Sequence, residues 1–164
     1  FDKAIKSEPE NSEYLGHKIE ALIELKRYEE AMQLSDESIK LDSDDPSGLF
    51  CKGKIFHELE RYEEAVDCFD KATALDSKNP SLWLDKAMTL KELKRYEEAK
   101  KYMQLAVRLM ASDPIINDHF ADVLWMNNNS LQARYYWNYV LRLKKTDEKL
   151  KKEIKRKLLF GLKS

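Results

Sequence analysis

The sequence has few residues that break helices. It contains four glycines and four prolines among 164 residues, and polar and apolar residues nowhere alternate over the length of a strand. No stretch approaches the roughly 20 apolar residues that a membrane-spanning helix needs. Charged residues make up 36% and hydrophobic residues 43% of the chain, a balance that suits amphipathic helices. We therefore predict an all-α fold with no membrane span.

Cysteine is also scarce. Cys51 and Cys68 are the only two, and their 17-residue separation matches neither a zinc-binding pattern nor a disulfide framework. We interpret them as reduced thiols within helices, which favours a reducing compartment and a cytoplasmic location. The sequence starts at Phe1 in the middle of a helical pattern, so we interpret it as part of a longer protein.

Motifs for catalysis or metal binding are missing. His17, His57 and His119 have no partner at a metal-ligand spacing, and there is neither a glycine-rich phosphate loop nor a nucleophile elbow. Paired glutamates such as Glu29 and Glu30 recur periodically, which is typical of structural residues. We therefore expect no enzyme, no metal and no cofactor.

The net charge of −1 hides an uneven distribution. Residues 144–164 carry nine Lys or Arg and three Asp or Glu, whereas the preceding 143 residues carry 20 and 27. An acidic body repels phosphate backbones, so we do not expect nucleic acid as the main partner.

One octapeptide recurs along the chain. Glu-Leu-Lys-Arg-Tyr-Glu-Glu-Ala occupies 24–31 and returns, with one change at most, at 58–65 and 92–99. Both intervals are 34 residues, a period typical of helical solenoids, in which each unit is a pair of helices that cannot bury its apolar face alone.

The starts of the repeat units are marked by Asp45-Pro46, Asn79-Pro80 and Asp113-Pro114. Each combines a good N-cap residue with a proline suited to the first helical position. The predicted units are 12–45, 46–79, 80–113 and 114–145, preceded at 1–8 by the second helix of a truncated repeat and followed at 146–163 by a C-terminal capping helix.

The repeating residues resemble a tetratricopeptide repeat array of bacterial or archaeal type. The resemblance rests on residues that recur in register: Leu49 and Trp83, the small Gly53 and Ala87, Tyr62 and Tyr96, and Ala65, Phe69, Ala72, Ala99, Met103 and Ala106. It implies a right-handed α-solenoid of helix-turn-helix repeats, whose first helices line a concave groove that holds a peptide or helix.

The resemblance also implies which residues face this groove. They are Glu20, Ile23, Phe50, Lys54, His57, Leu84, Met88, Lys91, Asp118, Asp122, Trp125 and Met126, with Glu13, Gly16, Glu24, Ser47, Glu58, Ser81, Glu92 and Ile115 at further groove positions. Apolar anchors among carboxylates favour a protein or peptide partner whose apolar side chains are flanked by Lys or Arg.

Chaperone C-terminal tails are not expected as partners. The family grips such tails with lysine, asparagine and arginine side chains on successive first helices. The corresponding positions here are Gly16, Glu20, Cys51, Ser81 and Asp85, or one repeat later Phe50, Lys54, Asp85, Ile115 and His119, and neither set supplies the three required side chains.

The last predicted helix has an apolar stripe at Leu150, Ile154, Leu158 and Leu162, with Thr146 as its expected cap and lysines on the other side. We interpret it as the cap of the solenoid. Basic amphipathic helices also contact anionic lipid or nucleic acid, and this alternative stays open.

Two functions fit these features. The first is a non-catalytic adaptor, or scaffold, that binds a partner in the concave groove. The second is a structural protein that self-assembles into a homo-oligomer through the solenoid ends or through a convex patch of Tyr135, Tyr136 and Tyr139.

Overall fold

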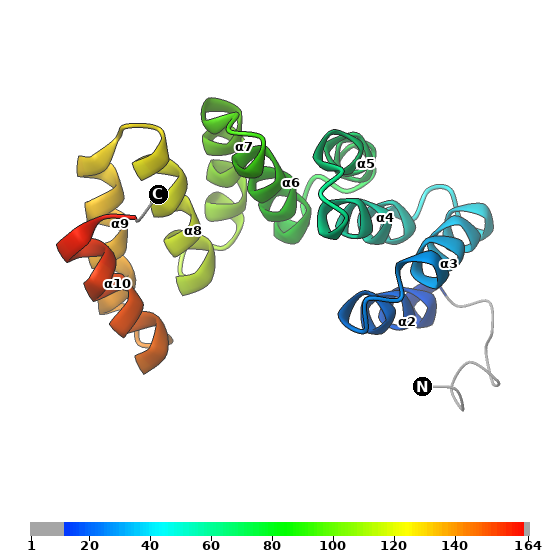
Figure 1. The fold of residues 1–164 in the computed structure, drawn as a ribbon, viewed down its shortest axis with the longest axis horizontal. Helices are drawn as coiled ribbons and strands as arrows, with labels where there is room; N and C mark the ends of the chain where they lie inside the picture. Colours follow the sequence, from blue (N-terminus) through cyan, green and yellow to red (C-terminus); the bar gives the residue numbers. More distant parts are fainter. Residues whose placement is uncertain (1–11, 163–164) are drawn as a thin grey trace. The chain divides into compact units, whose positions relative to one another are not determined.

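A computed structural model describes residues 12–162, and within this range the chain forms nine α-helices and no strand (Figure 1). The helices are α2 (Ser12–Glu24), α3 (Tyr28–Leu41), α4 (Pro46–Glu58), α5 (Tyr62–Leu75), α6 (Pro80–Glu92), α7 (Tyr96–Leu109), α8 (Pro114–Met126), α9 (Ser130–Arg142) and α10 (Glu148–Phe160). The all-α repeat fold is confirmed. The helix predicted over 1–8 lies outside the described residues.

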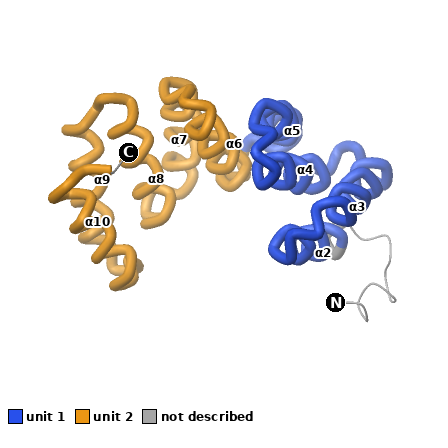
Figure 2. Tube along the Cα trace, in the orientation of Figure 1, with its two compact units in different colours: residues 1–77 blue, residues 78–164 orange. Residues whose placement is uncertain are grey.

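The chain divides into two compact units, residues 1–77 and residues 78–164 (Figure 2). The described part of unit 1 contains α2 to α5, and that of unit 2 contains α6 to α10. In both units, consecutive helices form antiparallel pairs joined by short turns (Figure 1).

Side-chain caps fix the starts of three first helices. Asp45 accepts a hydrogen bond from the Ser47 backbone N–H at 2.9 Å, and Asn79 accepts one from Ser81 at 3.0 Å. Asp113 accepts from the backbone N–H groups of Ile115 and Ile116. The predicted capping role of these three residues is confirmed, and it places the proline at the first helical position.

The turn within each pair contains one residue in the left-handed conformation. Lys26, Glu60, Lys94 and Asn128 have φ angles of 57°, 58°, 60° and 59°. The next residue donates its backbone N–H to a carbonyl near the end of the preceding helix, for example from Arg61 to the Phe56 carbonyl at 2.8 Å. This bond satisfies a carbonyl at the helix end and offsets the steric cost of the left-handed residue.

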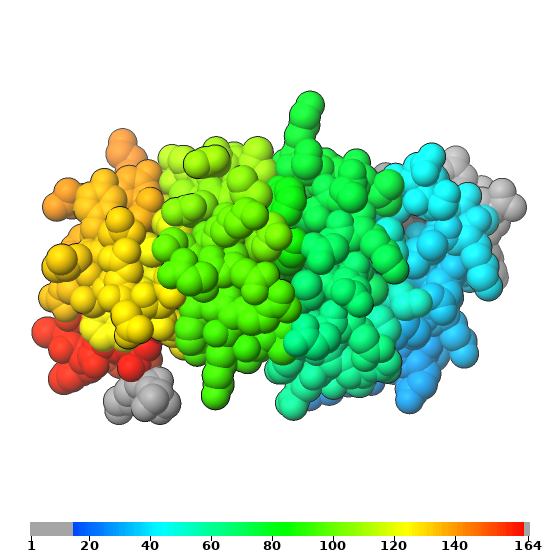
Figure 3. Space-filling model, turned by 90° about the horizontal axis from the view of Figure 1, so that it is seen from above, coloured from blue at the N-terminus to red at the C-terminus, as the bar shows by residue number. Residues whose placement is uncertain are grey.

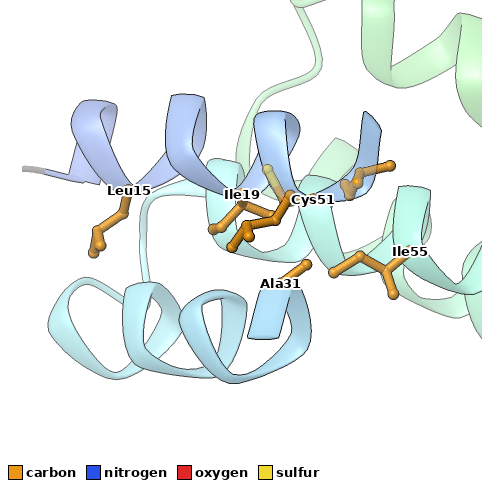
Figure 4. Close-up of a cluster of buried hydrophobic side chains, with 7 residues drawn as sticks. Leu15, Ile19, Ala31, Cys51 and Ile55 are labelled. Carbon is orange, nitrogen blue, oxygen red and sulfur yellow. The ribbon is translucent and has the colours of Figure 1, made fainter. Parts of the chain in front are cut away.

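The core of unit 1 lies between α2, α3 and α4. Ile19 from α2, Ala31 from α3 and Ile55 from α4 are fully buried, with Leu15 and Cys51 beside them (Figure 4). A satellite cluster around the buried Phe69 joins α4 to α5. Side chains close the gaps that separate paired ribbons in Figure 1, as the space-filling view shows (Figure 3). Each helix therefore packs an apolar face on its neighbour.

Close approach of paired helices depends on small residues. A Cβ atom placed on Gly53 of α4 would lie 2.6 Å from Cε1 of Phe69 in α5. The corresponding residues of unit 2, Ala87 and Ala121, are fully buried. The backbones of α4 and α5 can therefore approach only because position 53 carries no side chain.

The last helix differs from the prediction at its start. Asp147, not Thr146, caps α10, because the Asp147 carboxylate accepts the Leu150 backbone N–H at 2.7 Å. The Thr146 hydroxyl instead donates to the Val140 carbonyl at 2.6 Å, which ties the loop to α9. Ile154 is fully buried, so the apolar stripe of α10 faces the rest of unit 2.

We predict that Gly53→Ala lowers the free energy of unfolding by about 1–3 kcal/mol, because the added methyl group overpacks against the Phe69 ring. Gly16→Ala is the matched control, since a Cβ there meets no atom within 4 Å and alanine favours a helix by about 1 kcal/mol. Urea unfolding followed by circular dichroism measures both. Equal changes in the free energy of unfolding for the two substitutions would contradict the close approach of α4 and α5 at Gly53.

Candidate functional site

The first helices of unit 1 form an open pocket of about 210 Å³, which we call the α2–α4 pocket. Its lining consists of Gly16, His17, Glu20, Ser47, Phe50 and Cys51. Four of these residues, Gly16, Glu20, Ser47 and Phe50, are among the predicted groove residues. The structure therefore brings part of the predicted set to one concavity, between α2 and α4.

A salt bridge crosses the two helices at this pocket. The Lys54 ammonium donates to Oε1 of Glu20 at 3.0 Å, and Nδ1 of His17 lies 3.9 Å from Oε2 of the same carboxylate. All three side chains are partly exposed, so water screens the pair and its contribution to stability is small. Its effect is to hold Lys54 and Glu20 side by side at the edge of the pocket.

Phe50 supplies the aromatic wall. Its ring centroid lies 6.0 Å from that of Phe69 in a tilted arrangement, and Nζ of Lys54 lies 5.4 Å from its centroid. The side chain stays half-buried, with an exposed part facing the pocket. A little further along α4, His57 packs edge-on against Tyr62 with ring centroids 5.4 Å apart. Phe50 is thus held in place and can contact a partner.

Ile23 does not belong to this surface. Its residue exposure is 9%, and it packs in the core cluster with Leu22 and Ala31. The groove prediction for Ile23 is wrong, because the end of α2 turns this position toward α3 and α4.

Cys51 lies at the floor of the pocket but is poorly suited to nucleophilic chemistry. Burial is the main cause that raises the pKa of its thiol to about 12, and the nearby Glu20 carboxylate adds to the effect. The thiolate is the reactive form of cysteine, so this side chain stays protonated and inert at neutral pH. Both cysteines are buried and free.

In unit 2, three predicted residues lie on α6 and are all half-buried: Leu84, Met88 and Lys91. Nζ of Lys91 lies 3.3 Å from Oε1 of Glu92, so its charge is partly matched within the helix. A pocket of unit 2 is lined by other residues, Leu109 among them. The three predicted side chains therefore lie on a half-buried helix face outside that pocket.

The next two predicted residues, Asp118 and Asp122 of α8, already bind a lysine side chain of the same unit. Nζ of Lys157 in α10 lies 2.8 Å and 2.9 Å from the two Asp118 oxygens and 2.9 Å from Oδ2 of Asp122. The Lys157 side chain is 4% exposed and that of Asp118 is 7% exposed. Trp137 also donates its indole N–H to Asp122 at 3.2 Å. These carboxylates are therefore unavailable to a basic partner, contrary to the prediction.

Trp125 is half-buried, and the residue that follows α10 covers part of its ring. Gly161, which follows α10 with a φ of 71°, would place a Cβ 2.4 Å from Cζ2 of Trp125. The ring also packs against Trp137, with centroids 5.5 Å apart. Trp125 is thus a contact for α10, whereas Met126, 38% exposed, stays at the surface.

Electrostatics make the Asp118, Asp122 and Lys157 cluster sensitive to pH. Burial, together with the charge of Asp118, raises the pKa of Asp122 to about 6 despite the opposing effect of Lys157. Burial by itself lowers the pKa of Lys157, but the two carboxylates outweigh it and the pKa is raised. One ammonium shared by two carboxylates leaves an excess negative charge, which favours a proton on Asp122.

The sequence-based prediction missed two buried lysines. Lys86 of α6 places Nζ 3.4 Å from the centroid of Tyr102, whose ring stacks on Trp83, and Lys157 binds the two aspartates. Each lies within the apolar stripe of its helix, so a lone lysine among apolar positions is the signal that could have identified both.

A second pocket of unit 1 was also not predicted. It has a volume of about 430 Å³ and is lined by residues of α3 and the α4–α5 turn: Tyr28, Glu29, Met32, Gln33, Asp36, Leu59 and Arg61. Two of its charges are already paired, because Asp36 accepts from Lys52 and Arg61 binds Glu64. The pocket therefore offers mainly apolar contacts from Tyr28, Met32 and Leu59.

The tyrosine patch predicted for self-assembly is small. Tyr135 is 67% exposed, but Tyr136 packs edge-on against Phe120 with centroids 4.7 Å apart. The Tyr139 hydroxyl donates to the Ala111 carbonyl at 3.3 Å. Most of the aromatic area thus packs within unit 2.

Two classes of site are missing from residues 12–162. No group of three or more His, Cys, Asp or Glu side chains in this range is arranged to hold a metal ion. Every helix described is also too short or too polar to cross a bilayer.

Three protein-family models match the chain. Residues 1–72 match subunit 3 of the anaphase-promoting complex (cyclosome), residues 53–94 match a TPR repeat model and residues 80–112 match a tetratricopeptide repeat model. The chain is a tetratricopeptide repeat protein. No curated protein sequence gives a significant match.

Solved structures of other tetratricopeptide repeat proteins share this fold. A thermophilic one from Thermus thermophilus has a TM-score of 0.87 at 16% identity, over 97% of this chain and 87% of that chain. YrrB, described as having an unusual peptide-binding site, has a TM-score of 0.71 at 24% identity, over 87% and 74%. The first TPR domain of Spaghetti (RPAP3), bound to the HSP90 peptide SRMEEVD, has a TM-score of 0.62 at 25% identity, over 70% and 91%.

The matching repeat models support a general role for this tetratricopeptide repeat protein. Proteins of the family bind protein or peptide partners and are typically not enzymes, so the chain is a protein-interaction scaffold.

We predict that Asp122 makes the stability of this repeat protein depend on pH. Because the folded-state pKa of about 6 lies above the ordinary value of 3.8, the folded protein binds more protons than the unfolded chain between about pH 4 and pH 6. The Asp122 contribution to the free energy of unfolding therefore falls by about 2 kcal/mol as the pH rises through this window.

Urea unfolding of the wild type and of Asp122→Asn at pH 4 and pH 6.5 measures this contribution. The wild type should lose stability relative to the variant at the higher pH. If the difference in the free energy of unfolding between the two proteins is the same at both pH values, Asp122 titrates in the ordinary range.

Proposed function

We propose that the chain is a non-catalytic adaptor that holds a partner's peptide segment on the first helices of unit 1, at the α2–α4 pocket. The observation that supports this most directly is Phe50, a half-buried aromatic side chain held by Phe69 and partly open to the pocket. Anchored aromatic side chains carry much of the binding energy at protein interfaces.

The pocket suits an apolar side chain of the partner. Its volume of about 210 Å³ is sufficient for a leucine- or methionine-sized group, which would lie against Phe50 above the protonated Cys51. The Glu20 and Lys54 charges at the rim satisfy each other, so they need no charged partner.

Basic residues of the partner would reach Glu24 and Glu58. Both are exposed near the last turns of α2 and α4, and neither forms an ion pair within the described part of the chain. Exposed carboxylates steer and orient a basic segment more than they add affinity. The proposed ligand is therefore a peptide with an apolar anchor flanked by Lys or Arg.

The same charges disfavour acidic chaperone tails. Glu20 lies where the family's clamp for carboxylates has a polar or basic side chain, and Cys51 at another clamp position is buried. An acidic peptide would meet Glu20 without a gain from a matched cation.

Selection of peptides from a random library on the immobilised chain tests this proposal. We expect enrichment of sequences that combine apolar residues with Lys or Arg, and no binding of the acidic peptide SRMEEVD. Phe50→Ala should weaken the best selected peptide at least about tenfold in fluorescence anisotropy, since the aromatic wall is lost.

Matched variants separate the pocket from the rest of the surface. Leu41→Ala removes an exposed apolar side chain outside the pocket and should leave the dissociation constant unchanged. Glu24→Gln with Glu58→Gln should weaken binding and reduce its salt dependence, whereas Glu37→Gln with Asp67→Asn should do neither. Unchanged binding by Phe50→Ala, with the helical signal preserved, would remove the pocket from the proposal.

A further inference from the structure

The outward face of α10 has an unusual surface composition. Lys149, Lys152 and Arg156 follow one another at helical spacing, and Leu159 and Phe160 continue the same face. All five side chains are exposed, with Leu159 at 76% and Phe160 at 72%. This face, which we call the α10 outer face, lies opposite the buried Ile154.

The cations of the α10 outer face are not neutralised by close partners. Lys149, Lys152 and Arg156, like the neighbouring Lys155, form no ion pair within residues 12–162. The acidic residues of the same helix have other contacts, because Glu148 binds Lys151 and Glu153 lies 3.6 Å from Lys157. By contrast, the recurring arginines Arg27 and Arg95 are paired with Glu30 and Glu98.

Charge and apolar exposure together indicate one kind of partner. Unpaired lysines and arginines on one face attract an anionic surface, and large apolar side chains at the end of that face can enter the boundary between headgroups and acyl chains. A phosphate backbone would use the cations but would leave an exposed leucine without a contact. The arrangement therefore favours lipid over nucleic acid.

We propose that the α10 outer face docks on an anionic membrane surface. Lys149, Lys152, Lys155 and Arg156 contact the headgroups, and Leu159 and Phe160 insert beside them. The end of α10 is red in Figures 1 and 3. The helix lies on the surface and does not span it. The contact is independent of the α2–α4 pocket, so peptide binding and membrane binding can each fail alone.

Co-sedimentation of the full chain with lipid vesicles tests the proposal. Vesicles of phosphatidylcholine with about 30% phosphatidylserine should bind the chain at least about 100-fold more tightly than pure phosphatidylcholine, and added salt should weaken the binding. Because each cation near such a surface contributes about fivefold, Lys149→Gln with Lys152→Gln and Arg156→Gln should reduce binding roughly 100-fold.

A matched variant controls for total charge. Lys40→Gln, Lys71→Gln and Arg108→Gln remove three cations elsewhere and should leave vesicle binding within about threefold of the wild type. Leu159→Ser with Phe160→Ser should weaken binding but preserve its salt dependence, because the charges remain. Circular dichroism of each variant verifies that the helices are retained.

Three results would overturn the proposal. The first is equal binding of the chain to neutral and anionic vesicles. The second is an equal loss of vesicle binding in the triple variant of α10 (Lys149, Lys152 and Arg156) and in the matched triple variant elsewhere (Lys40, Lys71 and Arg108). The third is binding of a short DNA duplex, lost in the α10 variant, without binding to anionic vesicles; this would assign the face to nucleic acid.

Discussion

The close approach of the two helices in each pair is the constraint on which the structure depends. Residues that face the partner helix at the crossing must be small, and Ala31, Ala65, Ala99 and Ala133 are all fully buried there. Gly53 shows how narrow the space is, because even one methyl group would overlap the Phe69 ring. Larger apolar residues can then pack only to either side of the crossing, and this arrangement repeats with the 34-residue period.

Much of the fold could be predicted because its signals are local. A capping aspartate, a following proline and an apolar stripe act within a few residues of each other, so Asp45, Asn79 and Asp113 mark helix starts reliably. The left-handed conformation of Lys26, Glu60 and Lys94 could not be predicted in this way, since lysine and glutamate do not favour it. There the packing of both flanking helices determines the turn, and hydrogen bonds across it compensate for the strain.

The candidate site could be predicted only in part, because its contacts join residues that are far apart in the sequence. Glu20 and Lys54 are 34 residues apart and occupy equivalent positions in successive repeats, so the period brings them together. Lys157 meets Asp118 and Asp122 from 39 and 35 residues away, which is outside that rule. Repeat positions alone predict that both aspartates are exposed, because the lysine that covers them belongs to no repeat.

The buried Lys157 also explains how α10 presents its remaining charges. An uncompensated charge in the interior is strongly unfavourable, so Lys157 must face the two aspartates and cannot rotate outward without leaving them unpaired. With successive residues about 100° apart around the helix, this orientation turns Lys152 and Leu159 away from the aspartates, at about 140° and 160° from Lys157, and turns Arg156 to the side, at about 100°. The ion pair thus has two effects: it removes two carboxylates from the surface of α8 and fixes the direction of a basic face. The acidic body and basic tail of the sequence are in this way partly neutralised inside unit 2, while the surplus positive charge is held at its surface.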